Sequence, residues 1–207
     1  MSANGHRITS IEQLEALYGH PSGPAVAKEI DYIAPSYRKL IEAAPFVAIA
    51  TAGPEGVDCS PKGDAPGFVR ILDERTLALP DRPGNNRIDG FRNILRNPYI
   101  ALLFLIPGVG ETLRVNGRAE ISVEPELMQS FAVNGKLPRS VMIVHIERIF
   151  FHCSKAIVRS KLWDDATRID RKSLPSTGSI IAEVSQGRLG GEEYDRAAPE
   201  RIKAQLY

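Results

Sequence analysis

The chain has 207 residues, 43% of them hydrophobic and 25% charged, which is ordinary for one globular domain. Its formal net charge of +1 gives no reason to expect nucleic acid or an anionic membrane as a partner. Two cysteines lie far apart outside any CxxC pair and no secretory signal is visible, so we expect a cytoplasmic protein without disulfides.

The first 45 residues have helical patterns. Ser10 and Gln13 have the spacing of a capping box, and Gly19 ends the helix that follows. A second amphipathic segment spans about residues 25–44 and is interrupted by Pro35. We expect these helices to pack on the domain that follows them.

From Phe46 onward, short apolar runs alternate with turn residues, a pattern typical of an antiparallel barrel or sandwich. The predicted strands are 46–51, 57–60, 68–72, 76–79, 99–106, 112–122 and 141–151. The first two form a hairpin, for which residues 52–56 supply a five-residue connection.

Two helices are predicted between the strands. One runs from Asn86 to Arg96 with Asn85 or Asn86 as its cap, and the other runs from Pro125 to Ala132. After Trp163 the pattern is weak, and it predicts one helix near residues 179–185 and then a polar tail. The chain is therefore expected to be one domain, with a helical extension over 1–45, a barrel over 46–163, and a helix and tail over 164–207.

The loop over residues 79–87 leaves a strand and opens a helix. Free backbone N–H groups at a helix start attract an anion, and Arg82 and Arg87 could bind phosphate oxygens. Asn85 and Asn86 could cap the helix or bind a ligand hydroxyl. The alternative is a capped loop with two solvated arginines.

Two further segments could bind a ligand. In Ser60-Pro61-Lys62-Gly63, the lysine could reach a phosphate, although these are also turn residues. Residues 151–163 hold the only tryptophan, Trp163, close to Lys155 and Arg159, which suits a planar anionic ligand. The alternative for Trp163 is an anchor that holds a loop on the core.

Other classes of site have little support. His145 and His152 lie on one strand, seven residues apart and on opposite faces, so they cannot share a metal. The sequence has no HExxH, no zinc spacing, no GxSxG elbow and no phosphate-binding GxGxxG or GxxxxGK[ST] motif. The arginines between 87 and 96 could touch nucleic acid, but acidic residues dilute that patch.

Taken in order, these segments resemble the pyridoxamine 5′-phosphate oxidase superfamily, the FMN-binding split barrels. The resemblance covers about Phe46 to Trp163. It rests on Ser60-Pro61-Lys62-Gly63, on Pro80-Asp81-Arg82 with Asn85-Asn86-Arg87, on a helix ending at Asn97-Pro98, and on the Val115-Asn116-Gly117-Arg118-Ala119 strand. The run from Lys155 to Trp163 is similar to the C-terminal signature of an uncharacterised branch of probable FMN-dependent enzymes.

The resemblance implies a mainly β (α+β) fold, a six-stranded antiparallel split β-barrel with peripheral helices. It also implies a homodimer with FMN at the subunit interface. Carried over by position, the cofactor-binding residues are Ser60, Pro61, Lys62, Gly63, Pro80, Asp81, Arg82, Asn85, Asn86, Arg87, Thr112, Arg114, Arg159, Ser160 and Trp163. Of these, Arg82, Asn86 and Arg87 would hold the phosphate with Lys62, and Arg159, Ser160 and Trp163 would come from the partner subunit.

The family implies an FMN-dependent oxidoreductase that acts on a small molecule. The last eight residues, 200–207, lack the arginine motif with which the vitamin B6 oxidase grips its substrate phosphate, so another substrate is expected. The alternatives are a non-catalytic or haem-handling barrel, with His145 or His152 as axial ligand, and a binding module for RNA or protein. The sequence names no electron donor or acceptor and no catalytic residue.

Overall fold

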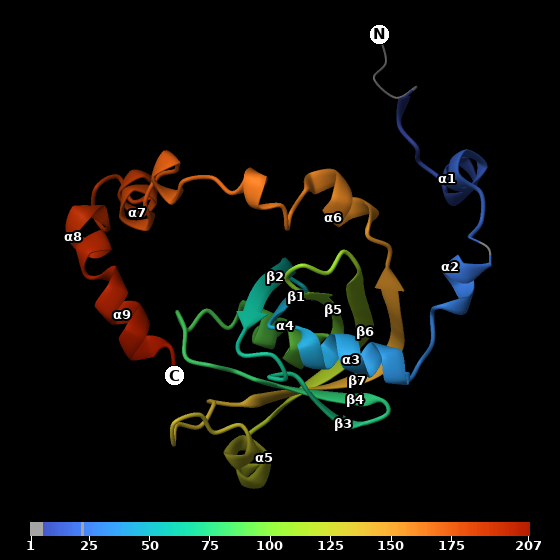
Figure 1. Ribbon diagram of the computed structural model, residues 1–207, viewed down its shortest axis with the longest axis horizontal. Coiled ribbons are helices and arrows are strands. Elements are labelled where there is room, and N and C mark those ends of the chain that lie inside the picture. Colours follow the sequence, from blue (N-terminus) through green and yellow to red (C-terminus); the bar gives the residue numbers. More distant parts are fainter. Residues whose placement is uncertain (1–5, 22) are drawn as a thin grey trace.

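One curled sheet of seven antiparallel strands forms the centre of the computed structural model, which describes residues 6–21 and 23–207 (Figure 1). Its strand order is β2-β1-β5-β6-β7-β4-β3. The strands are β1 (Phe46–Gly53), β2 (Gly56–Gly63), β3 (Arg70–Asp73), β4 (Thr76–Pro80), β5 (Tyr99–Leu105), β6 (Thr112–Ser122) and β7 (Val141–His152). Strands β2 and β3 are the edges of the sheet.

The expected fold class is confirmed, with one difference in strand count. The resemblance implies six strands, whereas the structure has seven; the short β3 pairs only with β4. The predicted five-residue connection between β1 and β2 is wrong. Pairing continues to Gly53 and Gly56, so only Pro54 and Glu55 form the turn.

The core lies on the inner face of the curled sheet. Val47 and Ile49 of β1 point inward with Leu102 and Phe104 of β5, and all four are buried. Alternate residues of a strand point to opposite faces, which is why these apolar positions are two apart. Helix α3 (Pro35–Ala43) covers this core and buries Tyr37 and Ile41 against it.

A β-bulge changes the face assignment on β7. Asn116 pairs with Arg148 but Gly117 pairs with Ile146, so Glu147 is an extra residue. As a result His145 and His152 both point away from the core, and the expectation that they lie on opposite faces is wrong. Only glycine fits at position 117, because a Cβ there would lie 2.0 Å from the His145 carbonyl oxygen.

The first two helices of the chain and its C-terminal helices lie on opposite sides of the barrel (Figure 1). Helix α1 (Ile11–Tyr18) has the predicted Ser10 cap, yet it buries no residue, so the expectation that it packs on the barrel is wrong. Helix α2 (Pro24–Ala27) is a short turn. Helices α4 (Asp89–Arg96), α5 (Pro125–Ser130) and α6 (Lys155–Ser160) follow along the chain.

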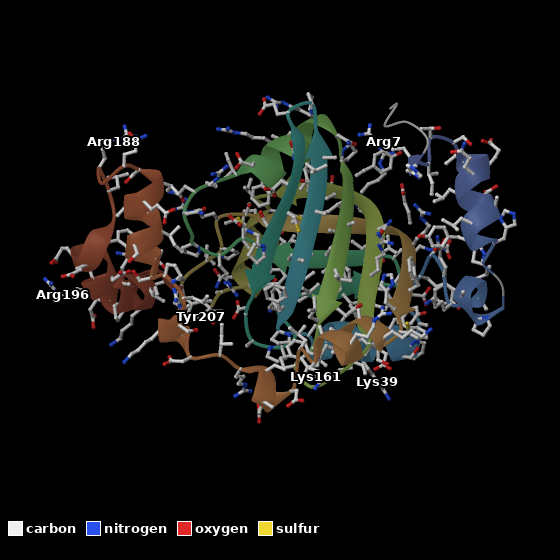
Figure 2. The ribbon with its side chains drawn as sticks, turned by 90° about the horizontal axis from the view of Figure 1, so that it is seen from above. Arg7, Lys39, Lys161, Arg188, Arg196 and Tyr207 are labelled. Atoms are coloured by element: carbon white, nitrogen blue, oxygen red, sulfur yellow. The ribbon has the colours of Figure 1, made fainter. Side chains whose placement is uncertain are left out.

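Three C-terminal helices replace the single one that was expected: α7 (Thr177–Val184), α8 (Gly191–Arg196) and α9 (Ala198–Gln205). Polar contacts hold α7 and α8 together, since Asp195 accepts hydrogen bonds from Ser176 and from the Gly178 N–H. The chain then returns toward the barrel, where Figure 2 shows Tyr207 between the C-terminal helices and the sheet. The Lys136 ammonium, in the loop before β7, donates to the backbone oxygen of Tyr207. Over residues 6–21 and 23–207, no helix is long and apolar enough to cross a membrane.

Substitutions in the buried core and in the exposed helix α1 should differ in their effect on the free energy of unfolding. Phe104→Ala removes a side chain that is 1% exposed and should lower the free energy of unfolding by about 3–5 kcal/mol. Leu17→Ala changes a 66% exposed residue of α1 and should cost at most about 0.5 kcal/mol. Guanidinium denaturation measures both values, and an equal loss in the two variants would contradict this division.

Candidate functional site

Two adjoining hollows, of about 280 and 420 Å³, lie between β2 and the segment that follows β4. The alternation along β2 points Asp58, Ser60 and Lys62 into them. The opposite wall consists of residues 80–88, the start of α4, and Arg139, Ser140 and Met142. Phe91, Ile49 and Met142 supply apolar surface, so the pocket combines apolar walls with several charged groups.

Lys62 connects the two sides of this pocket. Its ammonium donates to the Asp81 carboxylate at 2.6 Å, and the two side chains are 30% and 17% exposed. The Phe91 ring lies below, with its centroid 5.5 Å from the Lys62 Nζ. Strand β2 pairs only with β1, so this ion pair joins two parts of the sheet that share no backbone hydrogen bonds.

Arg82 is held by a second set of contacts. Its Nε donates to Asp64 at 2.8 Å and its Nη1 donates to the Phe131 carbonyl at 2.8 Å. The Tyr207 hydroxyl also donates to Asp64, at 2.8 Å. Burial alone would raise the pKa of Asp64, but hydrogen bonds from Tyr207, the Ala65 N–H and Arg82 outweigh it and lower that pKa. Arg82 therefore braces the loop to which it belongs.

The loop before α4 differs from the prediction. Helix α4 begins at Asp89, and its N-cap, Ile88, makes no side-chain cap hydrogen bond, so the expected start at Asn86 with an asparagine cap is wrong. The Asn85 side chain instead accepts from the Arg87 N–H at 3.0 Å, and Asn86 has a left-handed φ of 60°. A local turn of this kind competes with helix formation. It leaves Arg87 outside the helix, 78% exposed and paired with Asp89.

The structure divides the predicted site residues into two groups. The predicted residues on β2, at the end of β4 and in the loop after β4 all line the pocket. They are Ser60, Pro61, Lys62, Gly63, Pro80, Asp81, Arg82, Asn85, Asn86 and Arg87. The others do not line it: Thr112, Arg114, Arg159, Ser160 and Trp163. The Trp163 indole donates to the Val109 carbonyl at 2.8 Å, so it anchors the β5–β6 loop.

Sequence reasoning missed Arg139, which lines the pocket beside Ser140. The Asp81 N–H donates to the Ser140 carbonyl and the Arg139 N–H donates to the Asp81 carbonyl, so the β4–β7 pairing continues past the ends of both strands. The Arg139 guanidinium then donates to the Asn86 side chain at 2.6 Å. The register of β4 against β7 is the signal that could have found this residue.

A second cluster lies on the outer face of the sheet. The Arg114 guanidinium is 5.6 Å from the Phe150 ring centroid, and the Lys28 ammonium is 5.7 Å from it. The His152 ring packs against Phe150 with centroids 5.1 Å apart. Burial, Arg114 and Lys28 lower the pKa of His152 below its ordinary 6.5. In the ranges 6–21 and 23–207 no group of three His, Cys, Asp or Glu could hold a metal ion.

The lowered pKa of His152 predicts a loss of stability in mild acid. The unfolded chain takes up a proton at a higher pH than the folded chain, so the free energy of unfolding should fall as the pH drops below about 6.5. His152→Gln should flatten this decline. Denaturation curves between about pH 7 and 5.5 measure the effect. A decline that persists in His152→Gln would place its origin elsewhere.

The comparisons with known proteins agree with this architecture. A family model described as pyridoxamine 5′-phosphate oxidase matches residues 33–153. No curated protein matches the chain.

Solved structures match a little over half of the chain. HupZ of Group A Streptococcus is 24% identical, with a TM-score of 0.48 over 59% of this chain and 95% of that one. General Stress Protein 26 from Bacillus anthracis is 15% identical, with a TM-score of 0.43 over 55% and 88%. An FMN-binding protein from Syntrophomonas wolfei is 13% identical, with a TM-score of 0.41 over 55% and 86%. Because these identities and TM-scores are low, the assignment of the chain to a family depends on the family model.

Proposed function

The chain belongs to the pyridoxamine 5′-phosphate oxidase family, and we propose that it is an FMN-dependent oxidoreductase acting on a small molecule other than pyridoxamine phosphate. The observation that carries this proposal is the pocket between β2 and the loop after β4. It combines cationic and amide side chains from both walls with the apolar surface of Ile49, Phe91 and Met142. The chain has two exposed free thiols, Cys59 and Cys153, which are compatible with the reducing cytoplasm.

The residues of the pocket fit FMN in both size and chemistry. Adjoining hollows of about 280 and 420 Å³ are in the range of cofactor sites. Arg87 and Asn86, with Arg82, would hold the phosphate through charge-assisted hydrogen bonds. The other lining residues predicted from the family would contact the ribityl chain and ring: Ser60, Pro61, Gly63, Pro80, Asp81 and Asn85.

When bound, FMN supplies the electron transfer, and the protein supplies binding and electrostatics. Lys62 keeps a positive charge inside the pocket, with its ammonium fixed by Asp81. A fixed positive charge stabilises a ligand that gains negative charge on reduction. Asp81 thus acts as a positioning residue for Lys62.

The second group of predicted residues supports a homodimer that shares each FMN. Thr112 and Arg114 are on β6, outside the pocket of their own chain, so they could reach only a flavin bound to a second copy. The outer face also has small side chains at Ala50 and Ala101, which line a shallow hollow. Within the described residues, the buried Asn116 Oδ1 beside them has no hydrogen-bond partner. A second copy would cover this face and supply one.

The haem alternative requires an axial histidine. Among the residues that the structure describes, no histidine lines the pocket of its own chain, so an axial ligand would have to come from the outer face of a second copy. We therefore favour FMN as the cofactor. The absorption spectrum of the purified protein and the mass of the released chromophore decide between flavin and haem. A colourless protein that takes up no added FMN would contradict the proposed function.

The phosphate assignment predicts weaker FMN binding in Arg87→Ala. Loss of a charge-assisted hydrogen bond should cost about 1.5–3 kcal/mol, which is about 10- to 150-fold in affinity. Arg82→Ala should also weaken binding, with a loss of thermal stability because it removes the contacts to Asp64 and Phe131. Arg92→Ala, an exposed change on α4 outside the pocket, is the control. Unchanged affinity in both Arg82→Ala and Arg87→Ala would refute the assignment.

The shared site predicts complementation between subunits. Arg87→Ala and Arg114→Ala should each weaken both sites of a homodimer. In a heterodimer of the two variants, one site carries both defects and the other carries neither. Mixing the variants under conditions of subunit exchange should therefore recover tight FMN sites, measured by fluorescence titration. Wild-type affinity in Arg114→Ala, or no recovery on mixing, would count against a shared site.

A further inference from the structure

The charges of the pocket are unevenly paired. Lys62 pairs with Asp81, Arg82 pairs with Asp64, and Arg87 pairs with Asp89. In the part of the chain that the structure describes, two charged groups lining the pocket form no close ion pair, although the charge of one of them also acts on Arg87 from a distance. One is Arg139, and the other is Asp58.

Arg139 is fixed at the pocket wall by its backbone and its side chain. Pro138 before it and Ser140 after it are buried, and its N–H donates to the Asp81 carbonyl at 3.1 Å. The guanidinium donates to the Asn86 side chain at 2.6 Å. This hydrogen bond connects the wall beside β7 to the loop before α4. A guanidinium has five N–H donors, and one of them is used in this contact. The others can bind an anion without breaking an ion pair.

Asp58 is fixed on another wall. Its carboxylate accepts from the Ser60 hydroxyl at 2.8 Å, and the start of α4 packs closely over it. A Cβ at Gly90 would lie 3.1 Å from the Asp58 Oδ2, so the glycine allows this approach. A carboxylate held here repels a ligand anion and accepts hydrogen bonds from ligand hydroxyls.

From this asymmetry we propose that Arg139 is a specificity-determining residue that binds the phosphate of FMN together with Asn86, while Asp58 and Ser60 accept hydrogen bonds from the ribityl hydroxyls. The proposal rests on the proposed function and gives the flavin one orientation in the pocket. Arg82 is less suited to the phosphate, because its Nε and Nη1 are already bonded to Asp64 and Phe131. Arg139 therefore distinguishes FMN from riboflavin, whereas Asp58 contacts a part that both flavins share.

Titrations of the full chain with FMN and with riboflavin test this division. Arg139→Gln should weaken FMN binding by about 10- to 150-fold and leave riboflavin binding unchanged. Asp58→Asn should change the affinity for riboflavin as well as that for FMN, because the ribityl chain is common to both. Arg92→Gln, which removes an equal charge from the exposed side of α4, should change neither.

A competition experiment gives a second measurement. Inorganic phosphate should compete with FMN on the wild-type protein but compete little on Arg139→Gln. Arg139→Lys keeps the charge and should retain part of the preference for FMN. Arg139 is exposed, so its substitution should leave the melting temperature close to that of the wild type.

The outcomes separate this inference from the proposed function. If the wild-type protein binds neither flavin, the proposed function fails and this inference fails with it. If the wild type binds FMN but Arg139→Gln changes the affinities for FMN and riboflavin equally, or changes neither, the role of Arg139 is overturned while the function stands.

Discussion

The ion pair between Lys62 and Asp81 is the interaction on which the rest of the site depends. It joins β2, an edge of the curled sheet, to the end of β4, and no backbone hydrogen bond connects these strands. The Arg82–Asp64 pair makes a second connection nearby. Both pairs are largely shielded from water, so removing one member of either would leave an uncompensated charge. The width of the pocket is therefore set by side-chain electrostatics as well as by the sheet.

Ion pairs in the folded chain neutralise basic residues that look unpaired in the sequence. The loop from Pro80 to Arg87 reads as a cationic patch, but the folded chain brings Asp64 to Arg82 and Asp89 to Arg87. A neutralised loop has little attraction for a nucleic-acid backbone. The same pairing leaves Arg139 as a cation that a ligand can engage without breaking an existing contact. A net charge of +1 cannot reveal such a distribution, because pairing is a property of the fold.

Much of the fold follows from local pattern. Apolar alternation identified all the strands. The family resemblance named the residues of β2 and of the loop after β4 that line the pocket. The predictions failed where a local feature overrides the pattern. The Asn85 turn shortens α4, and the bulge at Glu147 shifts the alternation along β7. Arg139 escaped notice because its place depends on the register between β4 and β7, which no local pattern encodes.

The alternation of side chains on a strand also bears on the proposed homodimer. On β6, Leu113 and Val115 point into the core, so Arg114 between them must point outward. The pocket is lined from the inner side of β2, so one chain cannot bring Arg114 and Lys62 to the same ligand. A two-fold axis removes this restriction, because it places the outer face of one copy against the pocket of the other, twice and identically. If the family residues on both faces do contact flavin, the geometry of one strand is sufficient reason for the site to need two subunits.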